Sequence, residues 1–136
     1  MHVLSTDCWV APFPKNQDSM TKYLAIWDTG ATQSVINPKV VDELKLMPIG
    51  VTKVHGVGGV QESFQYIVGL KLPNEVFYSQ VIVTVGQFTD FQILIGMDII
   101  SSGSFAVTNR AGKTVMSFSY PSHDTIDFVQ QYPTRK

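Results

Sequence analysis

A single carboxylate follows directly after an apolar stretch in the first quarter of the chain. Residues 23–27 are largely apolar, and Asp28, Thr29 and Gly30 come next. An aspartate that ends a strand and turns at once on a glycine presents its side chain at a fixed place rather than in a random loop. A carboxylate held in this way can act as a general acid or base. The alternative is an ordinary aspartate in a strand-end turn.

Two further segments have a composition suited to a catalytic cleft. Residues 55–60 place Gly56, Gly58 and Gly59 around Val57, which predicts the tip of a hairpin that can open and close, or simply a flexible turn. Residues 93–98 are a continuously apolar run closed by Gly96 and followed by Met97 and Asp98. This run predicts a buried strand that leads into a short helix.

The rest of the chain predicts many short strands around these segments. Asn37 and Pro38 are typical of a helix N-terminus, and Pro48 ends that helix. A long hairpin is expected to bend at residues 56–59, and a second hairpin to turn at residues 109–112. The predicted strands are residues 2–10, 23–27, 33–36, 51–72, 76–85, 91–95, 105–107 and 114–118, with a short helix at 97–101. The fold class is therefore mainly β, with one or two short helices.

The three segments together resemble the retropepsin-like aspartic proteases. The Asp-Thr-Gly triplet, the glycine-rich flap and the apolar run ending at Gly96 occur in the order that this family has. The resemblance implies a closed β-barrel of the acid protease type over residues 1–120. Gly96-Met97-Asp98 looks more like the cellular and bacterial members than the retroviral ones, which carry Arg where Met97 stands.

The resemblance also assigns roles. Asp28, Thr29 and Gly30 match the catalytic triplet, and Ala31 lets the substrate backbone approach. Thr29 would bind the partner chain. The expected substrate-binding residues are Ile26, Ala31, Val35, Gly56, Val57, Gly58 and Leu94. Their apolar members predict a preference for apolar side chains beside the cleaved bond.

The presence of a single Asp-Thr-Gly predicts a homodimer. Peptide hydrolysis without a metal needs both a base for water and an acid for the carbonyl oxygen. Two carboxylates about 3 Å apart cannot both ionise, so they share one proton and supply both functions. Asp98 lies on the helix after the second segment in the resemblance and is not the second carboxylate. Asp28 and its copy are expected to meet on a two-fold axis.

Composition narrows the partners and the compartment. The 136 residues carry a net charge of -1 without a basic patch, so neither nucleic acid nor a membrane surface is expected as a partner. No metal or other cofactor is expected, because His2 and His123 have no ligand neighbours at suitable spacing. One cysteine, Cys8, and no visible signal peptide predict a cytoplasmic protein.

Two alternatives to an active enzyme stay open at this point. The chain could be a catalytically inactive binding or dimerisation module with the same fold, or a precursor that becomes active after trimming. Residues 121–136 form a C-terminal tail, in which residues 125–129 are either a strand at the dimer interface or a disordered end. Trp27, where a smaller aliphatic residue is usual, fills the core or the dimer interface, or narrows the site.

Overall fold

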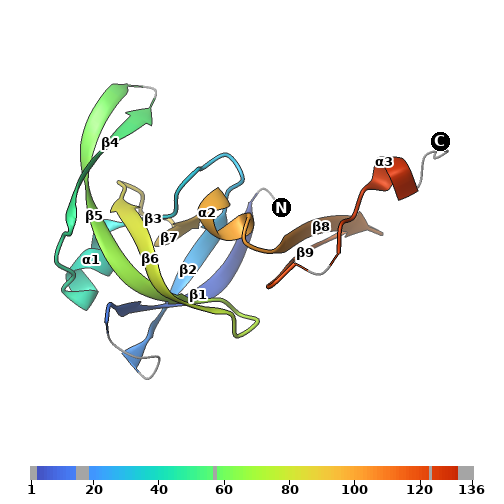
Figure 1. Cartoon of the computed structure of the whole chain (residues 1–136), viewed down its shortest axis with the longest axis horizontal. Coiled ribbons are helices and arrows are strands. Elements are labelled where there is room, and N and C mark those ends of the chain that lie inside the picture. The colour runs from blue at the N-terminus through green and yellow to red at the C-terminus, as the bar shows by residue number, and fades with distance from the viewer. Residues whose placement is uncertain (1–2, 15–18, 57, 123, 132–136) are drawn as a thin grey trace.

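The computed structural model describes residues 3–14, 19–56, 58–122 and 124–131. The main part of the fold is one seven-stranded β-sheet that curls into a barrel, with short helices at its margins (Figure 1). The strands of this sheet are β1 (Leu4–Pro12), β2 (Thr21–Trp27), β3 (Val35–Ile36), β4 (Gly50–Gly56), β5 (Gly59–Lys71), β6 (Phe77–Val85) and β7 (Ile93–Ile95). The predicted mainly-β fold class is confirmed.

The strand order explains how the sheet closes. The strands lie in the order β1-β2-β7-β3-β6-β5-β4, and β1 also pairs with β5. Antiparallel pairing of Trp9 with Lys71 and of Pro12 with Val68 completes the ring, while β4 continues beyond it. β1 runs through Pro12, two residues past the predicted end at Val10. A proline is tolerated at the last position of a strand, where the ladder requires no N–H from it.

The core lies inside this ring and follows from the two-residue period of the strands. Tyr23, Ala25 and Trp27 alternate inward along β2, and all three are buried. On β5 the inward residues Tyr66, Val68 and Leu70 are buried across a bulge between Val68 and Leu70, and Leu72 directly after the strand is buried too. Phe64 has the same alternation but is exposed, because this part of β5 still belongs to the hairpin with β4.

The helix α1 (Pro38–Leu44) begins as predicted at an asparagine cap. The Asn37 side chain accepts a hydrogen bond from the Val40 amide at 3.3 Å, and Pro38 occupies the first turn. The Asn37 amide group also donates to the backbone oxygens of Phe88 and Phe91, both at 3.2 Å. One side chain therefore caps the helix and fixes the loop between β6 and β7.

Two hairpins project from opposite sides of the barrel (Figure 1). We call β4–β5 beyond the barrel the flap, with strand pairing from Gly50 opposite Gln65 to Gly56 opposite Gly59. The second hairpin consists of β8 (Ser104–Arg110) and β9 (Lys113–Ser119), follows the helix α2 (Met97–Ile100), and forms a separate two-stranded sheet. In the tail, where a dimer-interface strand and a disordered end were both open, the single chain has the short helix α3 (Phe128–Gln131), capped by the Asp127 carboxylate.

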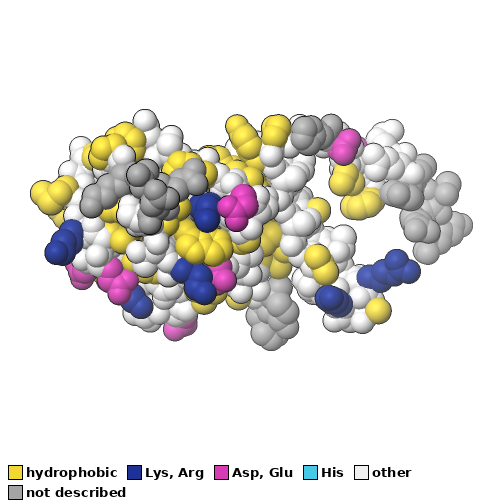
Figure 2. Space-filling model, turned by 90° about the horizontal axis from the view of Figure 1, so that it is seen from below, with side chains coloured by type: hydrophobic (Ala, Val, Ile, Leu, Met, Phe, Trp, Pro, Cys, Tyr) yellow, Lys and Arg dark blue, Asp and Glu magenta, His cyan; other side chains and the backbone are white. Residues whose placement is uncertain are grey.

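Charged side chains of both signs are scattered over the surface, as the sequence predicts. Figure 2 shows Lys and Arg side chains interspersed with Asp and Glu on the face seen from below, with apolar side chains between them. Across the described part of the chain, no helix has the length and apolarity that crossing a bilayer requires.

Candidate functional site

Asp28 sits at the end of β2, where the strand stops but its pairing continues for one more residue. β2 runs parallel to β7, with Trp27 opposite Ile95, and the Asp28 amide donates to the Ile95 oxygen at 2.9 Å. The residue is half-buried. The parallel neighbour therefore fixes the backbone from which the carboxylate extends.

The turn after Asp28 is closed by the aspartate itself. Its Oδ1 accepts a hydrogen bond from the Gly30 amide at 2.8 Å, and its backbone oxygen accepts one from the Ala31 amide at 3.2 Å. A Cβ on Gly30 would lie 3.1 Å from the same Oδ1. Glycine at this position therefore keeps the space beside the carboxylate open, while Thr29 is exposed at the tip of the turn.

The end of the turn is fastened to the strand β7 and the helix α2. The Met97 amide donates to the Ala31 oxygen at 2.7 Å. Gly96 packs so closely that an added Cβ would lie 2.9 Å from backbone atoms of both Ala31 and Gln33. Glycine at this position therefore allows the segment before α2 to pack directly against the turn that follows Asp28.

Ser34 and Asp98 form a hydrogen-bond network under the turn. Asp98 accepts bonds from the Ser34 amide at 3.0 Å and from the Ser34 hydroxyl at 2.8 Å. The Ser34 Oγ in turn accepts from the Gly96 amide at 3.1 Å, and Asp98 also caps the Ile99 amide. Ser34 is only 1% exposed. Asp98 thus lies on α2, as expected, and holds the segment that follows Asp28 in place.

Three predicted substrate-binding residues form one row across the sheet. Ile26 on β2 is opposite Leu94 on β7, and Leu94 is opposite Val35 on β3. All three are half-buried, whereas their neighbours Ala25, Ile93 and Ile36 point into the core. The row is therefore an apolar strip on the outer face of the sheet, next to the end of β2 that carries Asp28.

The flap provides the opposite side of a hollow. Gly56 and Gly59 face each other at its end, Gly59 has a φ of 106° that favours glycine, and Gly58 is exposed between them. Val57, predicted as a pocket wall, lies outside the described residues. Between the flap and β3–β6 is a hollow of about 330 Å³, lined by Val35, Val54, Gln61, Glu62, Ser63, Thr84, Val85, Gly86 and Gln87. The structure thus gathers Val35 with flap residues, and adds polar side chains that the sequence did not indicate.

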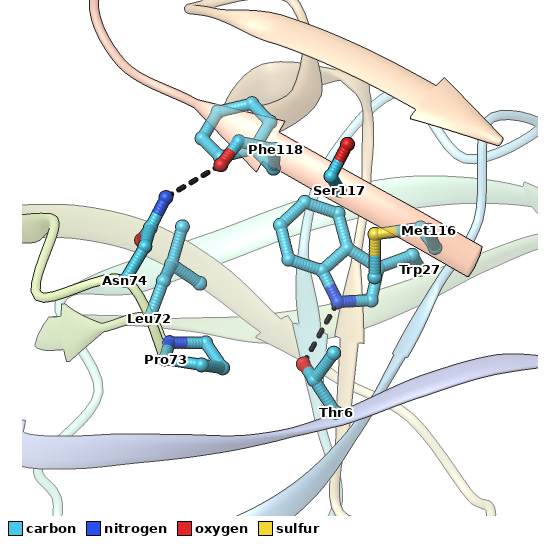
Figure 3. A pocket seen from close by; sticks show the side chains of 8 residues that line it. All are labelled: Thr6, Trp27, Leu72, Pro73, Asn74, Met116, Ser117 and Phe118. Atoms are coloured by element: carbon cyan, nitrogen blue, oxygen red, sulfur yellow. Dashed lines mark hydrogen bonds between the residues drawn. The ribbon is translucent and has the colours of Figure 1, made fainter.

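Trp27 points into the core and away from the apolar strip. Its side chain is 5% exposed and its indole N–H donates to the Thr6 Oγ1 at 2.9 Å (Figure 3). Its ring lies 5.8 Å from the Phe105 ring and 5.3 Å from the Phe118 ring. Of the interpretations open from sequence, core packing is the one that the single chain bears out.

Sequence reasoning missed Ser34, Asn37 as a loop anchor, and the polar lining of the hollow. A serine three residues before a helix start has no distinctive spacing, and its partner Asp98 is 64 residues away. For metals, the described residues contain no cluster of three or more His, Cys, Asp or Glu side chains. The two terminal histidines considered as ligands, His2 and His123, lie outside the described residues.

The chain is similar to known proteins in sequence and in fold. The profile of the family described as aspartyl protease matches residues 16–99, more than half of the chain. No protein of curated function matches the sequence. Among solved structures, EIAV protease with a bound inhibitor is 22% identical with a TM-score of 0.55, covering 73% of this chain and 86% of that one.

Two further structures share the fold. Simian foamy virus protease is 19% identical with a TM-score of 0.52, covering 72% of this chain and 92% of its own. A retropepsin-like aspartic protease from Rickettsia conorii is 13% identical with a TM-score of 0.50, covering 79% and 89%. Viral and bacterial proteins alike therefore have this arrangement of strands, and at these identities the likeness concerns the fold.

Proposed function

Because the chain belongs to the aspartyl protease family, we propose that it is an endopeptidase whose two catalytic carboxylates come from two copies of the chain. The observation that carries the proposal is the fixed position of Asp28, whose amide is bonded to β7 and whose turn is fastened to α2. A dyad needs both carboxylates held at short distance, and a rigid support on each subunit provides this.

In the proposed reaction the dyad holds one proton between its two members. The ionised carboxylate takes a proton from water, which attacks the carbonyl carbon of the scissile bond, while the protonated carboxyl group gives its proton to the carbonyl oxygen. The carboxyl group that took a proton from water then gives it to the leaving nitrogen as the C–N bond breaks. The other carboxylate takes back the hydroxyl proton as the carbonyl re-forms, so the dyad again holds one proton. The pair titrates as a unit, so its apparent pKa values belong to neither aspartate alone.

The substrate is proposed to lie extended between the flap and the apolar strip of Ile26, Leu94 and Val35, with Ala31 and the flap glycines beside its backbone. We expect apolar side chains next to the cleaved bond. Gln61 and Gln87 in the flap hollow favour acceptance of a polar side chain at one further position. Cleavage of a peptide library tests both expectations, and a preference for charged pairs would contradict them.

The decisive experiment mixes the wild-type protein with the Asp28→Asn variant. Asparagine cannot act as a base, so the pure variant is expected to lose all but a trace of activity, by about 10⁴-fold. If each site takes one aspartate from each chain, activity in exchanged mixtures falls with the square of the wild-type fraction. Asp90→Asn, which changes an exposed aspartate before β7, is the control and should retain activity.

The other outcomes decide between the remaining interpretations. Activity that falls linearly in the mixture would contradict a shared site. A dimer that forms normally but cleaves nothing, with or without Asp28, would support the inactive binding module instead.

A cytoplasmic location is proposed from the single cysteine, Cys8, which is buried and has no cysteine partner in the chain.

A further inference from the structure

The β8–β9 hairpin is attached to the barrel through side chains. It forms its own two-stranded sheet, separate from the seven-stranded one. The half-buried residues Phe105 and Phe118 lie against the Trp27 ring, at 5.8 and 5.3 Å between ring centres. The Asn74 side chain adds a hydrogen bond to the Phe118 oxygen at 2.6 Å. An aromatic cluster of Trp27, Phe105 and Phe118 is therefore a main point of attachment.

This attachment point lies one residue before Asp28 in the chain. Trp27 is the last residue of β2, and its indole is held from the other side by Thr6 on β1. A peptide unit is planar, so a rotation of the Trp27 backbone reorients the Asp28 amide that bonds to Ile95. The strand end that carries the carboxylate is therefore held by backbone pairing with β1 and β7 and, through the indole, by the hairpin.

The cluster is not closed on all sides. A cavity of about 210 Å³ lies beside Trp27, walled by Leu72, Pro73, Asn74 and β9 (Figure 3). Shortening Phe118 would enlarge this cavity and leave the indole without a partner on that side. The indole would then be free to turn, since space for it exists already.

We propose that Trp27 is a positioning residue, through which the orientation of the β8–β9 hairpin sets the placement of the Asp28 carboxylate. The effect on catalysis rests on the proposed function, whereas the coupling between the hairpin and Asp28 is a property of the folded chain. In this proposal the hairpin affects the position of the Asp28 carboxylate without contacting the substrate.

The test compares two truncations on the same hairpin. Phe118→Leu removes a ring that contacts Trp27, whereas Tyr120→Leu removes a ring that contacts Tyr78 at 5.8 Å and is the control. We expect Phe118→Leu to lower kcat about tenfold with KM nearly unchanged, because small misplacement of a catalytic group acts on the chemical step. The acidic limb of the pH profile should also shift, since the spacing of the two carboxylates sets their shared titration. Phe118→Tyr keeps the ring and should restore both.

A second readout does not depend on activity. The amide resonances of Asp28 and Thr29 should move in Phe118→Leu and stay in place in Tyr120→Leu. Resonances that are unchanged in both variants, or a Phe118→Leu variant that loses only thermal stability at constant kcat and pH profile, would overturn the proposal. If the wild-type protein proves inactive, the proposed function fails, and the amide resonances still decide whether the hairpin is coupled to Asp28.

Discussion

The two sides of the proposed cleft differ in how firmly they are held. On the floor, the turn after Asp28 is fastened by Ile95, Met97 and the Ser34–Asp98 network, and Gly96 leaves no room for a methyl group. On the flap, Val51, Val54, Val60 and Phe64 are exposed, and a Cβ on Gly58 would meet nothing within 4 Å. This contrast fits the proposed function, in which a rigid support holds the Asp28 carboxylate and the flap has few contacts to break on opening.

The same substitution on the two sides should give the largest contrast. Gly96→Ala places a methyl group 2.9 Å from backbone atoms that cannot move without shifting Ala31. We expect it to destabilise the fold by about 3 kcal/mol and to reduce kcat/KM in the fraction that stays folded. Denaturant unfolding with a parallel activity assay measures both. A variant as stable as the wild type would show that the floor is less rigid than its contacts indicate.

Ser34→Ala removes the centre of the network beneath the turn. The change leaves the Gly96 amide without its acceptor and removes the hydroxyl donor to Asp98. A buried hydroxyl in such a network contributes about 2 kcal/mol to the free energy of unfolding. Only the hydroxyl of Ser34 is lost, so its amide bond to Asp98 remains and the effect is smaller than for Gly96→Ala. Ser79→Ala, at an exposed position of β6, is the control and should change stability little.

Tyr23→Phe tests the pH response of the barrel itself. Burial first, and then the hydrogen bond to Glu43 at 2.8 Å, raise the pKa of Tyr23 above its ordinary value. The native state therefore keeps this hydroxyl neutral, while the unfolded chain loses the proton above about pH 10. Wild-type stability should fall as the pH rises above that value, because the unfolded state then binds fewer protons.

The Tyr23→Phe variant should lose about 1 kcal/mol at neutral pH and fall less steeply in alkali. Urea unfolding between neutral and alkaline pH measures the two slopes. Equal slopes for the two proteins would contradict the assignment to Tyr23. Tyr120→Phe, at an exposed tyrosine, controls for the loss of any hydroxyl.

Gly58→Ala should have the smallest effect. An added methyl group at the flap tip meets no other atom within 4 Å, so stability should change by less than about 0.5 kcal/mol. Measured beside Gly96→Ala, it gives the difference between cover and floor for one chemical change. A large loss of stability would mean that the flap packs against another surface in solution, and would contradict the difference in rigidity between flap and floor.

Much of the secondary structure and the identity of the candidate carboxylate could be predicted from the chain. The helix start at Asn37, the flap around its glycines and the strand before Asp28 all follow from local patterns. The segment before Asp28 correctly placed this aspartate at a strand end. For the tail, the sequence left a strand and a disordered end open, and it did not indicate the helix α3, which a local carboxylate caps.

The sequence alone determined that faces of certain strands are buried and that one aspartate stands at a strand end. The periodicity of apolar residues indicates which face of a strand is buried, but it does not indicate which other element packs against that face. Only the tertiary structure decided that β2 lies beside β7, that Ser34 meets Asp98, and that Trp27 turns toward Phe118 on a distant hairpin. These pairings join residues far apart in the chain, and they are chosen by which surfaces fit when the barrel closes, a property of the whole chain.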